Sequence, residues 1–221
     1  MRFLECFSIL FLLLFFGSDA DARIIRVPQD APEIPEAISA TQNGDTVLVS
    51  PGEWIGNSVG IEQWSIPFLS GKNITIASLF LTTRDSSYIA STIIKRAGET
   101  YTIGFGTGVD STTVLCGFTV FNHSSSMWGA IRCTSNASPT LRNLVINTLG
   151  GSAVGLMCDG AGHVRVFDSR FDTCVYGGAI CCENYSSLTL ENTTITDCWG
   201  TKGFLCAEKS ELYLKNVQIN K

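Results

Sequence analysis

Short runs of alternating apolar and polar residues cover most of the chain, and this period of two is typical of β-strands. Four runs in the C-terminal half are copies of one another, because each carries apolar positions on both sides of a central Asn or Asp. These central residues lie 25, 24 and 24 positions apart and are Asn143, Asp168, Asn192 and Asn216. A repeat of strands at this length indicates a solenoid whose coils stack on one another.

A second alternating element keeps the same period. It ends each time in a cysteine, again at spacings of 25, 24 and 24: Cys133, Cys158, Cys182 and Cys206. Three short strands fit into each repeat, and stacking at strand spacing places like residues over like. We therefore predict an all-β fold, a right-handed parallel β-helix with three strands per coil of about 24 residues, with its clearest repeats over 113–221.

The central Asn and Asp residues predict a structural ladder rather than a binding site. Asn tolerates the left-handed backbone that a tight bend between two strands requires, and a stacked amide bonds to the coils above and below. Asp168 breaks the row, so we expect a compensating partner there. Asn192 begins an N-x-T sequon, but as a member of a buried ladder it is not expected to carry a glycan.

The first residues have the pattern of a targeting segment and are not expected to belong to the folded domain. Arg2, an apolar run at 7–16 and an A-x-A motif at 20–22 are typical of a secretory signal peptide over residues 1–22. We expect no membrane span in the mature chain, because no second apolar run of that kind follows. The β-helix domain, residues 23–221, is therefore expected to be secreted or at the cell surface.

Residues 23–54 predict an N-terminal cap and first strand. The stretch 32–42 indicates a short helix with Ile34, Ala37 and Ile38 on one face. Such a helix would cover the open end of a β-helix, where strand edges and apolar rows are otherwise exposed. At the other end Lys221 directly follows an inward strand, without a closing segment. We expect a truncated C-terminus, with further coils or domains in a longer chain.

A family resemblance rests on the N-terminal stretch IIRVPQDAPEIPEAISATQNGDTVLVSPGEW and on GKNITIAS, GVDSTTVLCGFTV and SPTLRNLVI. The chain resembles bacterial right-handed β-helix proteins of the pectin-lyase-like superfamily, which often begin with a strand, a capping helix and a GDTV-x-V-x-PG-x-Y motif. Trp54 stands here in place of the motif's Tyr. The resemblance implies the fold and export, and it leaves open the activity, because the family includes lyases, hydrolases, epimerases and many other surface proteins.

The cysteines predict inward stacks. Besides the row of four, Cys174 and Cys198 lie 24 positions apart and should also face each other on neighbouring coils. Stacked Cα atoms are about 4.8 Å apart, within the range of a disulfide. Two alternatives remain open, namely disulfides between coils and a ladder of reduced thiols that pack as small apolar groups. The row of four favours thiols, and Cys174 with Cys198 is the better candidate for a disulfide.

Composition limits the partners. The formal net charge of -5 argues against nucleic acid as a partner, and 45% hydrophobic residues exclude a disordered chain. Only 16% of the residues are charged, which fits a surface made of Asn and Thr rows.

Two acidic residues and two tryptophans are the candidates for function. Asp159 and Glu183 would lie outward on neighbouring coils, about 5 Å apart, where they could serve a glycosidase or form part of a cation site. In pectate-lyase-like relatives, acidic clusters on the outer face bind Ca²⁺. A Ca²⁺ ion is expected only if the protein is a lyase, and no other cofactor is evident. Trp128 and Trp199 lie near loops and could contact glycans.

Three functions follow from these features. The first is an exported β-helix protein that binds polysaccharide or a cell-surface glycan without an evident catalytic site. The second is a polysaccharide lyase or glycoside hydrolase that uses Asp159 and Glu183. The third is a structural spacer within a larger surface protein.

Overall fold

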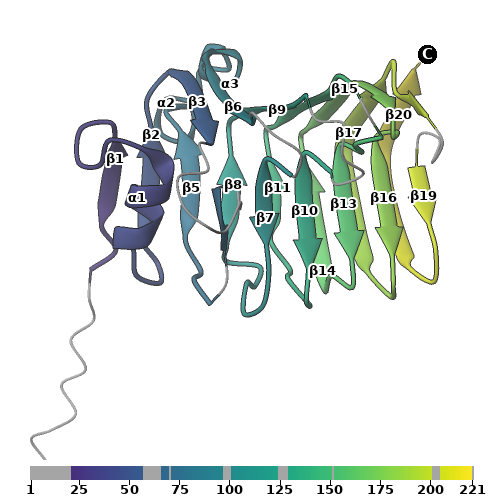
Figure 1. Ribbon diagram of the computed structural model, residues 1–221, viewed down its shortest axis with the longest axis horizontal. Coiled ribbons are helices and arrows are strands. Elements are labelled where there is room, and N and C mark those ends of the chain that lie inside the picture. The colour runs from purple at the N-terminus through teal and green to yellow at the C-terminus, as the bar shows by residue number, and fades with distance from the viewer. Residues whose placement is uncertain are drawn as a thin grey trace, which may run out of the picture.

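The computed structural model describes residues 21–56, 66–69, 71–96, 101–123, 129–150, 152–200 and 205–220. These residues form a parallel β-solenoid of about 7 turns with about 24 residues per turn. The coils follow one another along the long axis of the molecule (Figure 1). The all-β parallel β-helix that the repeats predict is confirmed.

Each coil has three faces, and the described strands pair in parallel along each face. Face 1 comprises β1 (Ile24–Val27), β2 (Thr46–Val49), β5 (Thr75–Ser78), β8 (Val114–Cys116), β11 (Thr140–Arg142), β14 (His163–Phe167) and the first halves of β17 (Ser187–Thr196) and β20 (Glu211–Asn220). Face 2 comprises β3 (Gly52–Gly56), β6 (Thr92–Arg96), β9 (Thr119–Asn122), β12 (Val145–Thr148), β15 (Arg170–Tyr176) and the second halves of β17 and β20. The short strand β18 (Trp199–Gly200) pairs with the end of β15. Face 3 comprises β4 (Ile66–Leu69), β7 (Ile103–Phe105), β10 (Ile131–Thr134), β13 (Leu156–Asp159), β16 (Ile180–Glu183) and β19 (Leu205–Ala207).

Apolar residues of successive coils stack in rows inside the solenoid. On face 2, for example, Ile146 pairs with Phe171 and Phe171 with Ile195, and all three side chains are fully buried. The next member, Ile219 on β20, is 49% exposed, because no described strand packs beyond β20. The predicted inward rows are therefore correct, but the last described coil buries its own row only in part.

The predicted ladder lies at the bend between face 1 and face 2. All four residues have a left-handed backbone, with φ of 53° at Asn143, 51° at Asp168, 51° at Asn192 and 52° at Asn216. The Asn216 side-chain amide donates to Asn192 Oδ1 at 2.8 Å, and the Asn192 amide donates to Asp168 Oδ1 at 3.0 Å. Asp168 thus has the compensating partner that its place in the row requires.

One part of the ladder prediction is wrong, because the ladder is not buried. Asp168, Asn192 and Asn216 are exposed, since the left-handed bend turns their side chains outward while the apolar rows on either side fill the interior. Asn192 is nevertheless engaged through both its amide nitrogen and its amide oxygen.

The cysteine rows follow the prediction up to the last coil. Cys133, Cys158 and Cys182 are aligned across β10, β13 and β16 as fully buried free thiols. The predicted place of Cys206 in this row is wrong, because β19 pairs so that Cys206 lies opposite Cys181 and Ala207 opposite Cys182. The cause is one extra residue after Gly200, since β18 keeps the 24-residue spacing to β15 and β19 has a spacing of 25 to β16.

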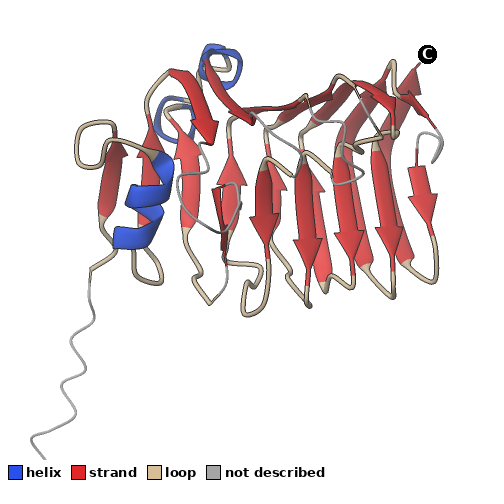
Figure 2. Ribbon diagram, in the orientation of Figure 1, coloured by secondary structure: helices blue, strands red, loops and turns tan. Residues whose placement is uncertain are grey.

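The predicted N-terminal helix is confirmed as α1 (Ile34–Ala40), with Ile34, Ala37 and Ile38 buried. It lies beside β1 and β2 at the N-terminal end of the solenoid (Figure 1). Two further short helices, α2 (Phe80–Thr83) and α3 (Ser87–Ser91), interrupt the coil between β5 and β6. The described helices thus belong to the N-terminal half, and strands form the rest of the solenoid (Figure 2).

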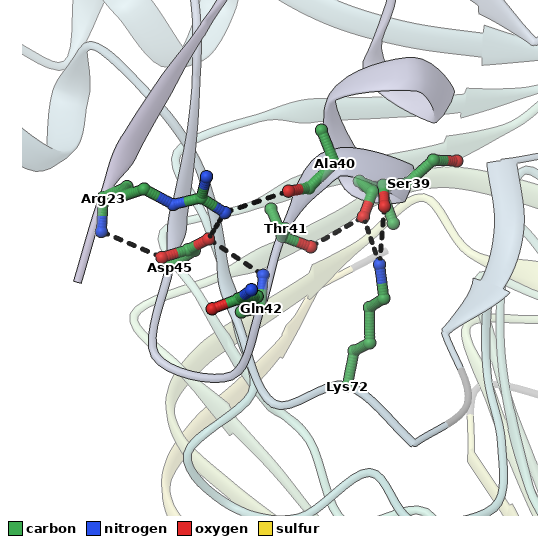
Figure 3. Close-up of polar contacts among 8 residues, drawn as sticks. Arg23, Ser39, Ala40, Thr41, Gln42, Asp45 and Lys72 are labelled. Atoms are coloured by element: carbon green, nitrogen blue, oxygen red, sulfur yellow. Dashed lines mark hydrogen bonds and ion pairs between the residues drawn. The ribbon is translucent and has the colours of Figure 1, made fainter. Parts of the chain in front are cut away.

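A polar network fastens α1 to the first coils (Figure 3). The Arg23 guanidinium donates to Asp45 Oδ2 at 2.7 Å and to the carbonyl of Ala40 at 3.0 Å. Lys72 Nζ donates to the carbonyls of Ile38 and Ser39 at 2.8 and 3.0 Å. Both cations therefore satisfy carbonyl groups at the C-terminal end of the helix, where the helix dipole favours positive charge.

The predicted leader falls on residues 1–22, of which 1–20 lie outside the described residues. Among the helices of the described residues, none is both long enough and apolar enough to cross a membrane.

Candidate functional site

The outer surface of face 3 brings the two predicted acidic residues together. Asp159 at the end of β13 and Glu183 at the end of β16 are direct partners in the parallel pairing. Their neighbour in the preceding coil is Thr134, at the end of β10. The predicted position of the two carboxylates on neighbouring coils is therefore correct.

Asp159 is held by partners from the coils on both sides. Arg132 donates to Asp159 Oδ2 at 3.2 Å, and the Asn184 side chain donates to Asp159 Oδ1 at 2.7 Å. The Arg132 and Asp159 side chains are only 18% and 27% exposed, so solvent screens their ion pair less than it would an exposed pair. The contact ties three successive coils together on the outer surface.

Sequence analysis did not identify Arg132 and Asn184 as partners of Asp159. The position of Arg132 in the repeat could have indicated this contact. Arg132 lies two residues before Thr134, and Thr134 pairs with Asp159. The Arg132 side chain therefore reaches the Asp159 carboxylate along a diagonal between neighbouring coils. Asn184 directly follows Glu183, in a turn where its φ is 55°.

Glu183 has a neighbour within its own strand. The thiol of Cys181 donates to Glu183 Oε1 at 3.2 Å. Cys181 is itself fully buried. Each carboxylate of the pair is thus hydrogen-bonded to protein groups, and the bonds of Asp159 join neighbouring coils. For Asp159 this suits a structural role more than the role of a nucleophile. Within the described residues, no group of three or more His, Cys, Asp and Glu side chains is placed to hold a metal ion.

An exposed aromatic pair lies at the end of face 2. Trp199 is 52% exposed and Tyr176 is 51% exposed. Their ring centroids are 5.1 Å apart and the ring planes are inclined by 60°. The rings come from neighbouring coils, because β18 pairs with the last residues of β15, with Trp199 opposite Val175. We call Tyr176 and Trp199 the aromatic platform.

The backbone beneath the platform approaches very closely. Gly200 pairs with Tyr176, and a Cβ at position 200 would clash with the Tyr176 carbonyl oxygen. Only glycine fits such an approach. Tyr176 itself has a left-handed φ of 71°. The close approach at Gly200 and the left-handed backbone of Tyr176 together determine the relative position of the Tyr176 and Trp199 rings.

The platform includes one of the two tryptophans singled out from the sequence. Trp128 lies outside the described residues. Sequence analysis missed Tyr176, for which the available signal was its place 23 residues before Trp199, close to the repeat length.

A second aromatic contact lies on the outer surface of face 1. The rings of His163 and Tyr213 stack in parallel, with centroids 6.0 Å apart, and His163 Nε2 lies 2.8 Å from Thr189 Oγ1. Burial and then the nearby charge of Arg165 lower the pKa of His163, which favours its neutral form. This contact spans three coils and is flat, polar and partly exposed.

A small hollow of about 270 Å³ lies where face 3 turns into face 1 near the N-terminal end, lined by Asn43, Gly44, Asn73, Ile74, Thr75 and Thr112. The side chain of Asn73, which lines the hollow, already forms hydrogen bonds within the protein: it donates to Asp110 Oδ2 at 3.1 Å and accepts from the Asp110 backbone N–H at 3.0 Å. The hollow is smaller than most ligand pockets, and the aromatic platform is the stronger candidate for binding.

The chain matches no family model, no curated protein and no solved structure.

Proposed function

We propose that the protein is an exported β-helix protein of the pectin-lyase-like type that binds polysaccharide or a cell-surface glycan through the aromatic platform. The single observation that carries this proposal is the pair of half-exposed rings of Tyr176 and Trp199 on neighbouring coils. Tyr and Trp are enriched at interaction surfaces. Their flat apolar faces suit the C–H faces of sugar rings, while the polar edges of Tyr and Trp accommodate hydroxyl groups.

Two further features support a glycan as the ligand. The signal peptide expected at residues 1–22 would bring the chain to glycans outside the cell. The strand that carries Tyr176 also carries an ion pair at its other end, between Arg170 and Asp172 at 3.2 Å. A glycan chain that extends along this strand from the platform would find polar groups there for its hydroxyls.

Binding to a panel of polysaccharides tests the proposal, by affinity electrophoresis and then by calorimetry on the best ligand. We expect selective binding that weakens about tenfold or more in Trp199→Ala and in Tyr176→Ala, the loss expected when a central aromatic contact is removed. Tyr185→Ala is the matched control, because Tyr185 is 80% exposed but does not belong to the platform. Absence of selective binding, or equal loss in all three variants, would contradict the proposal.

The adjacency of Asp159 and Glu183 favours a second candidate function, a polysaccharide lyase or glycoside hydrolase, with Ca²⁺ only in the lyase case. Release of unsaturated uronate, measured with and without Ca²⁺, and release of reducing sugar detect the two reactions. Activity that Asp159→Ala or Glu183→Gln abolishes would establish this alternative. Absence of both binding and activity would favour the third candidate, a structural spacer.

A further inference from the structure

Two buried cysteines lie directly behind the aromatic platform. Cys174 precedes Tyr176 by two residues on β15, and Cys198 immediately precedes Trp199. The pairing of Val175 with Trp199 places the two cysteines next to each other on neighbouring coils. Both side chains are fully buried free thiols.

The contact between these cysteines is direct. The backbone N–H of Cys174 donates to Sγ of Cys198 at 3.3 Å, so the sulfur of Cys198 points toward Cys174. Strands of neighbouring coils lie about 4.8 Å apart, which is within the Cα separation that a disulfide needs. Each cysteine also directly follows a residue with a left-handed backbone, Thr173 with φ of 57° and Asp197 with φ of 51°. Both cysteines therefore lie next to an irregular bend in the chain.

The other cysteine row offers a different environment. Cys133, Cys158 and Cys182 lie within regular strands of face 3, and Cys158 has a thiol on each side. In-register side chains of regular strands point the same way, and the Cys158 thiol is hydrogen-bonded to the thiols of both Cys133 and Cys182, so this row does not single out one pair of sulfurs. The pair behind the platform is therefore the better place for a covalent bond between coils.

We propose that Cys174 and Cys198 are an oxidation site, where a small-molecule disulfide produces a covalent bond between the two coils that carry Tyr176 and Trp199. The bond would fix the relative position of the two rings. This consequence for binding rests on the proposed function, whereas the formation of the bond does not.

The reaction is a pair of thiol–disulfide exchanges. The Cys198 thiolate attacks one sulfur of the small disulfide RSSR, forms a mixed disulfide and releases RS⁻. The Cys174 thiolate then attacks Sγ of Cys198 and releases the second RS⁻. The protein loses two hydrogens as two protons and two electrons, and RSSR is reduced to two RSH.

Mass spectrometry of alkylated protein tests the oxidation site. Reduced protein is refolded in mixtures of oxidised and reduced glutathione, so that the buried thiols are accessible, and is then alkylated and digested. We expect two cysteines to escape alkylation and a cross-linked peptide to contain Cys174 and Cys198. Cys198→Ser should remove this peptide, whereas the matched variant Cys182→Ser should retain it. Full alkylation in the most oxidising mixture, or a cross-link within the Cys133, Cys158 and Cys182 row, would overturn the proposal.

A comparison of the two redox forms tests the link to binding. We expect the oxidised form to bind the selected polysaccharide several-fold more tightly than the reduced form, because fewer conformations of the platform remain to be ordered. Equal affinity of the two forms would overturn the link while the disulfide stands. Absence of binding by both forms would count against the proposed function, and the peptide map would still decide the oxidation site.

Discussion

At the residue scale, single side chains determine the bends between face 1 and face 2. Asn143, Asp168, Asn192 and Asn216 combine a left-handed backbone with short polar side chains. Most other residues pay about 1–2 kcal/mol for that backbone. The bonds between Asn192, Asp168 and Asn216 then join neighbouring coils on the solvent side. The row thus holds the corner of the solenoid from outside, while apolar residues hold it from inside.

Asn192 is the position at which these two contributions can be separated. Asn192→Ala should lower the free energy of unfolding by about 2 kcal/mol, because it strains the backbone and removes the amide bonds. Asn192→Gly keeps the left-handed backbone and should cost about 1 kcal/mol from the lost bonds. Urea unfolding measures both values. Equal losses in the two variants would show that the left-handed backbone conformation contributes nothing measurable at this position.

At the element scale, α1 depends on a buried carboxylate. Asp45 has a side chain that is 3% exposed. It accepts hydrogen bonds from the Arg23 side chain and from the backbones of Gln42 and Arg23. These bonds, that of the Arg23 side chain first, lower the pKa of Asp45 to about 2 from its usual value of 3.8. The helix and the first two strands of face 1 are thus joined through one ionised group.

This group predicts a dependence of stability on pH. Because its folded-state pKa is depressed, Asp45 contributes stability that is fully present above about pH 4 and is lost as the pH falls toward 2. Asp45→Asn should lower stability at pH 7 and reduce the loss between pH 4 and 2. Glu36→Gln, an exposed change on the same helix, should leave both unchanged. Thermal unfolding across this pH range is the measurement, and an unaltered profile in Asp45→Asn would contradict the assignment.

The short strand β18 positions the platform through its glycine. Gly200→Ala should weaken glycan binding about tenfold, because the added Cβ would clash with the Tyr176 carbonyl and move Trp199 away from Tyr176. Gly160→Ala is a control at a left-handed glycine with open space around its Cβ position, so it tests backbone strain elsewhere. Calorimetry with the selected polysaccharide checks both. Equal affinity of Gly200→Ala and the unchanged protein would show that Gly200 does not position the platform for binding.

At the scale of the whole molecule, burial depends on the number of neighbouring coils. In a solenoid each coil contacts only those beside it, so stability is a sum of local contributions and interfaces. Ile195 on β17 has coils on both sides and is fully buried, whereas Ile219 on β20 is its direct partner and is 49% exposed. The two positions share residue type, face and row.

This pair predicts unequal costs for one substitution. Ile195→Ala should lower the free energy of unfolding by about 2–5 kcal/mol, the range for a buried Ile. Ile219→Ala should cost about 1 kcal/mol, because much of its surface is already in water. Urea unfolding of both variants provides the comparison. A large loss in Ile219→Ala would mean that this side chain is covered in solution.

Local periodicity was sufficient for the fold. The 24-residue spacing of Asn and Cys predicted the β-helix, because in-register stacking places identical positions over one another. The helical period of residues 32–42 predicted the buried face of α1, and the 24-residue spacing predicted the adjacency of Asp159 and Glu183. The spacing failed at Cys206, where an extra residue after Gly200 shifts the pairing by one. Such a shift is decided by backbone pairing and leaves no local signal.

By itself, the sequence thus determined which residues recur, which face inward and where the chain bends. Only the tertiary structure decided which side chains from different coils meet. Arg132 reaches Asp159 along a diagonal, Tyr176 approaches Trp199 over Gly200, and the ladder faces water although its neighbours are buried. The physical reason is that periodicity fixes positions along one strand, whereas contacts between coils depend on register, bend geometry and the reach of each side chain.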